Sequence, residues 1–316
     1  MLGTSLLIIS LGVLLIWYSA EKLEKYSVIS AQQSGMSPFF IGSTVIAFGT
    51  SAPEMLTSIF AIFEKKGTMV IGNIIGSNIA NLSLVFGSVL LVISLKKQQL
   101  TQDSNIIKDL YILLVSSILI IIILWIDPFS PFSSLVLLSG LGLVIGYWFR
   151  NGKDTPSEKI AEKSFFNYLK LFLAIFILII AAWLITKGAM QILERYELGS
   201  LFIGFTILAI GTSLPEIAAS ISLAMKGRYQ TVAGTLIGSN IFNGLFVLAI
   251  PGLFYETDIS EGWNVTEWMP LLLLMFIITL IFSIYIFSLS KKIRTGSVIL
   301  SLIFLSSYFI SLLYAH

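Results

Sequence analysis

The sequence predicts an all-α polytopic membrane protein with ten transmembrane helices, arranged as two inverted-topology repeats of five helices. Three observations lead to this fold class. Hydrophobic residues make up 56% of the 316-residue chain and charged residues 11%, whereas a soluble domain has about 25% charged residues. Apolar runs of roughly 20 residues recur along the chain, each long enough to cross a bilayer as a helix. Two sequence blocks also recur at one fixed offset.

The apolar runs do not alternate with a period of two residues, which favours helices over the strands of a barrel. The first run lacks the basic segment of a signal peptide, so it is taken as a span that ends near "EKLEK". The polar segment 151–166 is the predicted linker between two halves, transmembrane repeat 1 (1–150) and transmembrane repeat 2 (167–316). The ten predicted spans are 2–20, 38–63, 69–93, 109–126, 131–149, 167–190, 200–225, 231–254, 267–288 and 296–314.

The distribution of basic residues predicts the orientation in the membrane. With the N-terminus outside, 15 of the 19 Lys and Arg residues fall in the cytoplasmic loops and 4 fall outside. Cytoplasmic loops are enriched in Lys and Arg, so this bias favours that orientation. We therefore expect a multi-pass protein of the cell (inner or plasma) membrane, with both termini extracytoplasmic and a cytoplasmic linker.

The two halves contain related sequences. "IGSTVIAFGTSAPEMLTSIF" (41–60) aligns with "IGFTILAIGTSLPEIAASIS" (203–222), and "GNIIGSNIANLSLV" (72–85) aligns with "GTLIGSNIFNGLFV" (234–247), both at an offset of 162 residues. Five spans separate equivalent points, and because five is odd the copies must cross the membrane in opposite directions. Inverted repeats are common in secondary transporters, whose substrate sites lie near the midplane on broken helices.

The "GTSAPE" block predicts an interruption of the second span and, through its copy, of the seventh. Pro53 has no N–H to bond the carbonyl of Gly49, and Gly49 lets the chain bend. Such a break is tolerated in lipid only where it faces protein or a polar cavity. Glu54 follows Thr50 by four residues and Ser51 by three, so the three share a helical face. The second copy repeats this cluster with Thr212, Ser213, Pro215 and Glu216.

The "GSN" block adds neutral oxygen atoms. Ser77 and Asn81 are four residues apart and share a face, as do Ser239 and Asn243 in the copy. Oxygen ligands with two carboxylates are typical of a site for hard cations such as Ca²⁺ or Na⁺. A charged residue at a helix centre costs about 2.5–3.5 kcal/mol on insertion scales, so two glutamates at equivalent positions indicate a function. The chain has no Cys, and its one His is His316, which leaves no internal soft-metal ligand.

Other functions were weighed against cation transport. An intramembrane hydrolase built on Ser51 or Ser213 would need a base, and the chain has no internal His or Cys to supply one. A passive cation channel is a third possibility, although inverted broken helices favour a carrier. A single polar residue in a membrane helix more often has a structural role. The duplication of the whole cluster favours an ion-binding site instead.

At these residues the sequence resembles the calcium/cation antiporter superfamily, most closely the prokaryotic sodium/calcium exchangers. The resemblance covers the whole chain and rests on the paired G-T-S-x-P-E and G-S-N-x-x-N motifs. It implies a secondary antiporter that exchanges Na⁺ for Ca²⁺ by alternating access at a site near the midplane; the alternative is an H⁺/Ca²⁺ exchanger that uses the same site. Spans one and six are similar to the mobile pair of that family. The implied ion ligands are Glu54, Glu216, Thr50, Thr212, Ser51, Ser213, Ser77, Ser239, Asn81, Asn243 and the carbonyls of Ala47 and Ala209.

One departure from the family pattern concerns charge. Many relatives carry Asp at the position of Asn243, and some carry it at the position of Asn81, whereas this chain has Asn at both. The implied site therefore holds two carboxylates, which match the charge of one Ca²⁺. The resemblance implies no enzyme activity and no cofactor. The expected partners are inorganic cations (Ca²⁺, Na⁺ and, in the alternative, H⁺) and the lipid bilayer, with no nucleic acid and no obligate protein partner.

Overall fold

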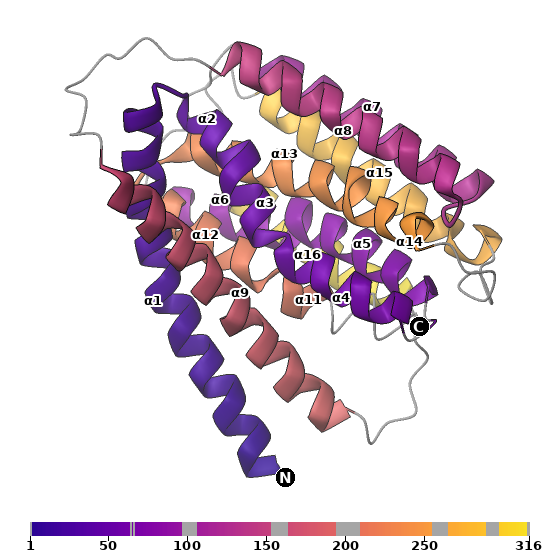
Figure 1. Ribbon diagram of the computed structural model, residues 1–316, viewed down its shortest axis with the longest axis horizontal. Helices are drawn as coiled ribbons and strands as arrows, with labels where there is room; N and C mark the ends of the chain where they lie inside the picture. Colours follow the sequence, from indigo (N-terminus) through magenta and orange to yellow (C-terminus); the bar gives the residue numbers. More distant parts are fainter. Residues whose placement is uncertain are drawn as a thin grey trace.

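The computed structural model describes residues 2–63, 65, 67–96, 106–152, 164–193, 209–254, 265–288 and 297–314. Every regular element in these residues is helical (Figure 1). Seven stretches are long and apolar enough to cross a membrane, and two shorter apolar helices cover Phe165–Ala181 and Ala209–Met225. The seven are Leu6–Ser34, Pro38–Phe63, Gly67–Leu95, Ile106–Ile126, Pro131–Asn151, Tyr229–Leu253 and Trp268–Phe287. The chain is therefore an all-α membrane protein, as predicted.

The first half consists of α1 (Leu2–Ser34), a composite second helix, a composite third helix, α7 (Ile106–Ile126) and α8 (Pro131–Asn151). The composite helices contain short π-helical segments, η1 and η2, in which the backbone carries an extra residue per turn. The second helix comprises α2 (Pro38–Ile41), η1 (Gly42–Ile46), α3 (Ala47–Thr50) and α4 (Ala52–Phe63). The third comprises α5 (Gly67–Ala80), η2 (Asn81–Val85) and α6 (Phe86–Leu95).

The second half repeats this order where it is described. It consists of α9 (Phe165–Leu193), α11 (Ala209–Thr212), α12 (Leu214–Met225), α13 (Tyr229–Leu245), the 3₁₀ turn η4 (Val247–Ala249), α14 (Ile250–Leu253), α15 (Val265–Ser288) and α16 (Ser297–Tyr314). Residues 200–208 of the predicted seventh span and most of the predicted linker 151–166 lie outside the described residues. The described parts of the other predicted spans are helical apart from turns at Ser51, Phe246 and Phe254.

The first helix is longer than predicted. We expected a span over residues 2–20 that ends at "EKLEK", but α1 continues to Ser34. The charged residues do not end the helix because Glu21 and Lys25 are four apart, a spacing that supports a helix. Leu23 and Ala31 remain buried on the other face of this extension. Tertiary contacts along that face, rather than local polarity, decide the length of α1.

The helices form a central bundle with two flanking groups (Figure 1). The composite helices α2–α4, α5–α6, α11–α12 and α13 pack against one another in the centre. The long helices α1 and α9 pack along each other and project from one side. The pair α7 and α15 pack together along the opposite edge. This arrangement places the two recurring sequence motifs in the interior.

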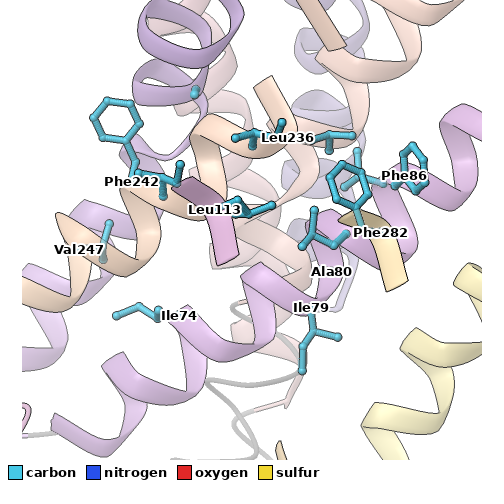
Figure 2. Packing of buried hydrophobic residues seen from close by; sticks show 14 of the residues in the cluster. Ile74, Ile79, Ala80, Phe86, Leu113, Leu236, Phe242, Val247 and Phe282 are labelled. Atoms are coloured by element: carbon cyan, nitrogen blue, oxygen red, sulfur yellow. The ribbon is translucent and has the colours of Figure 1, made fainter. Parts of the chain in front are cut away.

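Buried hydrophobic side chains join the central bundle to the flanking helices (Figure 2). Phe86 of α6 contacts Phe282 of α15 and Phe304 of α16, with ring centroids 4.7 Å and 5.1 Å apart. Both pairs are edge-to-face, which is the favoured arrangement of aromatic rings. Leu236 of α13 and Leu113 of α7 also belong to this cluster. The core therefore holds α13 and α6 in fixed positions around the motifs.

Glycines bring α13 into backbone contact with the second helix. A Cβ at Gly234 would lie 2.9 Å from the amide nitrogen of Ser43, and one at Gly238 would lie 2.7 Å from the Cβ of Ala47. These distances are shorter than van der Waals contact, so only glycine permits the observed packing. The "GTLIG" spacing of four places both glycines on one face of α13, as expected for close helix packing.

Candidate functional site

Both "GTS-x-PE" motifs adopt the same backbone conformation. Ser51 separates α3 from α4 with φ −80° and ψ 2°, and Ser213 separates α11 from α12 with φ −79° and ψ 0°. These angles lie between the main allowed regions, where turn and active-site residues are often found. Gly49 is helical, and a Cβ there would lie 2.5 Å from Cγ2 of Ile175 in α9. The prediction that the chain bends at Gly49 was therefore wrong: the departure falls on the serine, and the glycine makes room for α9.

The interruptions place each glutamate in the first turn of a helix. Glu54 lies in the first turn of α4, and Glu216 lies in the first turn of α12. The N-terminus of a helix carries a partial positive charge, which favours a carboxylate there. Both glutamates are 0% exposed. The local conformation of the motif therefore supports a buried negative charge that the interior of the bundle would otherwise disfavour.

Hydroxyl groups from the two halves meet in two equivalent pairs. The Oγ1 of Thr50 lies 3.4 Å from the Oγ of Ser239. The Oγ of Ser77 lies 3.5 Å from the Oγ1 of Thr212. Each pair joins the first motif of one half to the second motif of the other half. The repeat offset of 162 residues relates Thr50 to Thr212 and Ser77 to Ser239, so the two pairs are equivalent. Tertiary structure thus brings together four hydroxyls that lie far apart in the sequence.

The Glu54 carboxylate lies among groups from both halves of the chain. The hydroxyls of Thr212 and Ser77 face it, and it interacts electrostatically with Glu216. Neither oxygen of Glu54 accepts a well-formed hydrogen bond. An acceptor buried without a donor typically costs about 1–3 kcal/mol, and a charged acceptor costs more. This carboxylate therefore lacks a partner from the chain itself.

The environment of Glu216 differs from that of Glu54. Its Oε1 accepts a hydrogen bond from the Oγ of Ser51 at 3.4 Å, while its Oε2 has no partner. The equivalent bond would join Ser213 to Glu54, but the Oγ of Ser213 and both Glu54 oxygens have no hydrogen-bond partner. One member of a symmetry-related pair of bonds is therefore made and the other is open.

Asn81 and Asn243 are also fully buried with unsatisfied polar atoms. Both side chains are 0% exposed, and neither the oxygen nor the nitrogen of either amide has a hydrogen-bond partner. Asn81 is the first residue of the π-helical segment η2, a distortion that often marks functional sites. Asn243 lies in α13, the helix that also carries Ser239. Both lie one turn after the serine of their motif, as the spacing predicts.

Ala47 and Ala209 occupy equivalent positions one turn before the interruptions. Both are 0% exposed. The carbonyl of Ala47 accepts a hydrogen bond from the amide of Ser51 at 3.0 Å, and that of Ala209 accepts one from the amide of Ser213 at 3.1 Å. The carbonyl of Ala47 also accepts a hydrogen bond from the hydroxyl of Thr50 at 3.4 Å.

Among the described residues, no group of three or more His, Cys, Asp or Glu side chains could hold a metal ion. The acidic groups at the motifs are the two glutamates, and the polar groups around them are hydroxyls and amides. Oxygen ligands of this kind suit hard cations, with Ca²⁺ preferring six to eight oxygens in flexible geometry. The chemistry of the cluster therefore fits a hard cation better than a transition metal.

Asn73 is a residue of this cluster that the sequence reasoning did not select. Its Oδ1 accepts a hydrogen bond from Thr212 at 3.4 Å, and its Nδ2 donates to the Oγ1 of Thr57 at 3.2 Å. The Thr57 hydroxyl lies 3.0 Å from the carbonyl of Glu54. Asn73 thus links α11 to α5 and α4. Its position four residues before Ser77 places it on the same helical face, which could have revealed it.

We expect Asn73→Ala to weaken ion binding, because the Thr212 hydroxyl would lose the group that orients it. The loss of one hydrogen bond of about 0.5–1.5 kcal/mol corresponds to an apparent affinity roughly 2- to 10-fold lower. The equivalent residue in the second half, Thr235, bonds the carbonyl of Thr231 in its own helix, so Thr235→Ala is the matched control. Equilibrium Ca²⁺ binding to the purified variants would measure both. Equal losses in the two variants would contradict an orienting role.

Buried carboxylates and hydroxyls gathered at helix interruptions in an all-α membrane fold are typical of secondary transporters. The sequence profile of the family described as "Sodium/calcium exchanger protein" matches residues 4–149 and 166–316. The chain belongs to this family of calcium/cation antiporters.

Individual relatives agree with this assignment. Sodium/calcium exchanger MaX1 of Methanosarcina acetivorans is 26% identical over 344 residues, covering 87% of this chain and 97% of the relative. Inner membrane protein YrbG of Escherichia coli is 30% identical over 295 residues, covering 89% of each chain. A solved structure of the sodium-calcium exchanger NCX_Mj superimposes with a TM-score of 0.80 at 29% identity, covering 98% of each chain.

Proposed function

We propose that this protein exchanges Na⁺ for Ca²⁺ at a site formed by Glu54 and Glu216. The observation that carries the proposal is that both carboxylates are fully buried, face hydroxyls from both halves and keep three of their four oxygens without a hydrogen bond. A bound Na⁺ or Ca²⁺ would supply the partner that these carboxylate oxygens lack. The family membership and the NCX_Mj match support antiport as the type of transport.

The proposed ligands divide by charge. The two carboxylates would balance one Ca²⁺, and the neutral oxygens would complete the coordination of either ion. The hydroxyl oxygens gather in the pairs Thr50–Ser239 and Thr212–Ser77. Ser51, Ser213, Asn81, Asn243 and the carbonyls of Ala47 and Ala209 are the remaining proposed ligands. Several neutral oxygens are of more use to Na⁺ than to a proton, which favours Na⁺ as the counter-ion.

Competition for the same carboxylates explains why the protein would exchange ions rather than leak them. An empty site leaves two uncompensated charges in the protein interior, which is costly. Occlusion and reorientation would then require a bound cation. In this proposal the two halves form inverted repeats of five helices, with broken second and seventh helices near the midplane and both termini extracytoplasmic.

The experiment that tests the function is Ca²⁺ uptake into proteoliposomes. Vesicles loaded with Na⁺ are compared with vesicles loaded with choline, and a third set carries an imposed pH gradient without Na⁺. We expect uptake that requires the outward Na⁺ gradient. Uptake driven only by the pH gradient would instead identify H⁺/Ca²⁺ exchange, and uptake without any counter-ion would identify a passive pathway.

A further inference from the structure

Two serines lie one helical turn beyond the glutamates, outside the proposed ligand set. Ser58 of α4 follows Glu54 by four residues, and Ser220 of α12 follows Glu216 by four residues. This spacing places each serine on the same helical face as its glutamate. Ser58 is 1% exposed and Ser220 is 0% exposed. Neither hydroxyl has a hydrogen-bond partner.

Several other buried serines in the described helices satisfy their hydroxyls within their own helix. Ser83, Ser117 and Ser283 each donate to the carbonyl four residues earlier, at 2.5 Å, 2.9 Å and 2.8 Å. Such back-bonding is the usual way for a helix to satisfy a buried hydroxyl. A buried hydroxyl without a partner is unfavourable. Its occurrence at both of two equivalent positions indicates a partner that does not belong to the chain.

The two serines lie on opposite sides of the glutamates with respect to the membrane. Helix α4 ends at Phe63, shortly before Gly67, the first residue of a helical stretch that crosses the bundle to Leu95. At the far end of this stretch, the Nζ of Lys96 donates a hydrogen bond to the carbonyl of Met225, the last residue of α12. The C-terminal ends of α4 and α12 therefore face opposite sides.

We propose that Ser58 and Ser220 bind the transported cation in transit, each on one of the two routes between the glutamates and solvent. Each hydroxyl would replace one water of a partly dehydrated hard cation, Na⁺ or Ca²⁺. A single neutral oxygen binds weakly, and a site on a conduction route must release its ion as readily as it accepts it. The proposal deepens the proposed exchange function and rests on it for the identity of the ions.

A third unpaired buried hydroxyl lies on a helix that packs against α12. Ser30 of α1 is 1% exposed and has no hydrogen-bond partner. It lies in the part of α1 that extends beyond the predicted span, and α1 packs against α12. The helix that carries Ser220 therefore has a neighbour with an unpaired buried hydroxyl of its own.

The absence of cysteine from the chain permits a direct test of access. Ser58→Cys and Ser220→Cys each introduce one thiol, which a membrane-impermeant cationic thiosulfonate reagent can modify in oriented proteoliposomes. We expect the reagent to modify each variant from one side only, from opposite sides for the two, and more slowly at saturating Ca²⁺. Ser117→Cys, which replaces a back-bonded serine, is the control and should remain unmodified. Modification of neither Ser58→Cys nor Ser220→Cys from either side would overturn the proposal.

Transport kinetics of alanine variants provide a second, independent test of the two routes. We expect Ser58→Ala to raise the KM for Ca²⁺ about tenfold on one side of the membrane only, and Ser220→Ala to do so on the other side, since each removes one oxygen from a charged ligand. A merely structural role would change both sides equally, and unchanged KM values on both sides would also contradict the proposal. The wild type could show no Na⁺-driven uptake while the two thiols were still modified from opposite sides. That result would contradict the proposed Na⁺/Ca²⁺ exchange but would support the two access routes.

Discussion

Glu54→Gln is expected to abolish Ca²⁺ uptake driven by a Na⁺ gradient. The variant keeps the shape of the side chain but leaves Glu216 as the only carboxylate facing a divalent cation in the buried site. Removing one partner of a buried charge interaction typically costs about 2–5 kcal/mol, which corresponds to Ca²⁺ binding weaker by about 30- to 4,000-fold. Calcium uptake into Na⁺-loaded proteoliposomes measures the loss.

The matched variant Glu216→Gln should lose uptake to a similar degree, because Glu216 is equally buried and occupies the equivalent position. Glu216 differs from Glu54 in accepting a hydrogen bond from Ser51. Glu21→Gln changes an exposed glutamate of α1 and serves as the control for the chemical change itself. Undiminished uptake by Glu54→Gln would mean that the duplicated motif does not hold the transported ion.

Gly238→Ala is expected to destabilise the protein and to impair transport. The added Cβ would lie 2.7 Å from the Cβ of Ala47, which precedes the interruption at Ser51. Forcing an extra carbon into a well-packed interface costs about 1–3 kcal/mol, even though alanine is the better helix former. The displaced segment carries Thr50, so the pair with Ser239 should also be disturbed.

The fraction of purified protein that remains monodisperse after heating in detergent would report the loss of stability, and Ca²⁺ uptake would report the loss of function. Gly146→Ala is the matched control, because a Cβ at that position of α8 meets nothing within 4 Å. We expect the control to be as stable as the wild type or slightly more stable, since alanine favours a helix over glycine. Equal behaviour of the two variants would show that the contact between α13 and α3 tolerates a methyl group.

The asymmetry between the two glutamates follows from contacts that the sequences of the two halves do not share. Asn73 links Thr212 to Thr57, whereas the equivalents of Asn73 and Thr57 in the second half are Thr235 and Ala219. Alanine has no hydroxyl, so the network cannot form twice. The two halves therefore share a backbone conformation at the interruption but differ in the side chains that hold it.

The sequence by itself determined that the chain is an all-α membrane protein, because a bilayer permits few solutions for long apolar runs. The prolines Pro53 and Pro215 predict a departure from regular helix shortly before them, but not that it falls on Ser51 and Ser213. The four-residue spacing predicts that Ser77 and Asn81 share one face of a helix. These properties depend on neighbours within about two turns, which a sequence contains in full.

Only the tertiary structure decided which faces meet. Helical periodicity shows that Asn73 and Ser77 share a face, but it does not say that Thr212 lies opposite them. It could not show that the hydroxyls of Ser58 and Ser220 remain unpaired while other serines bond their own helices. It also could not predict the full length of α1, whose end depends on neighbouring helices. These features depend on contacts between residues far apart in the chain, and local spacing carries no information about such partners.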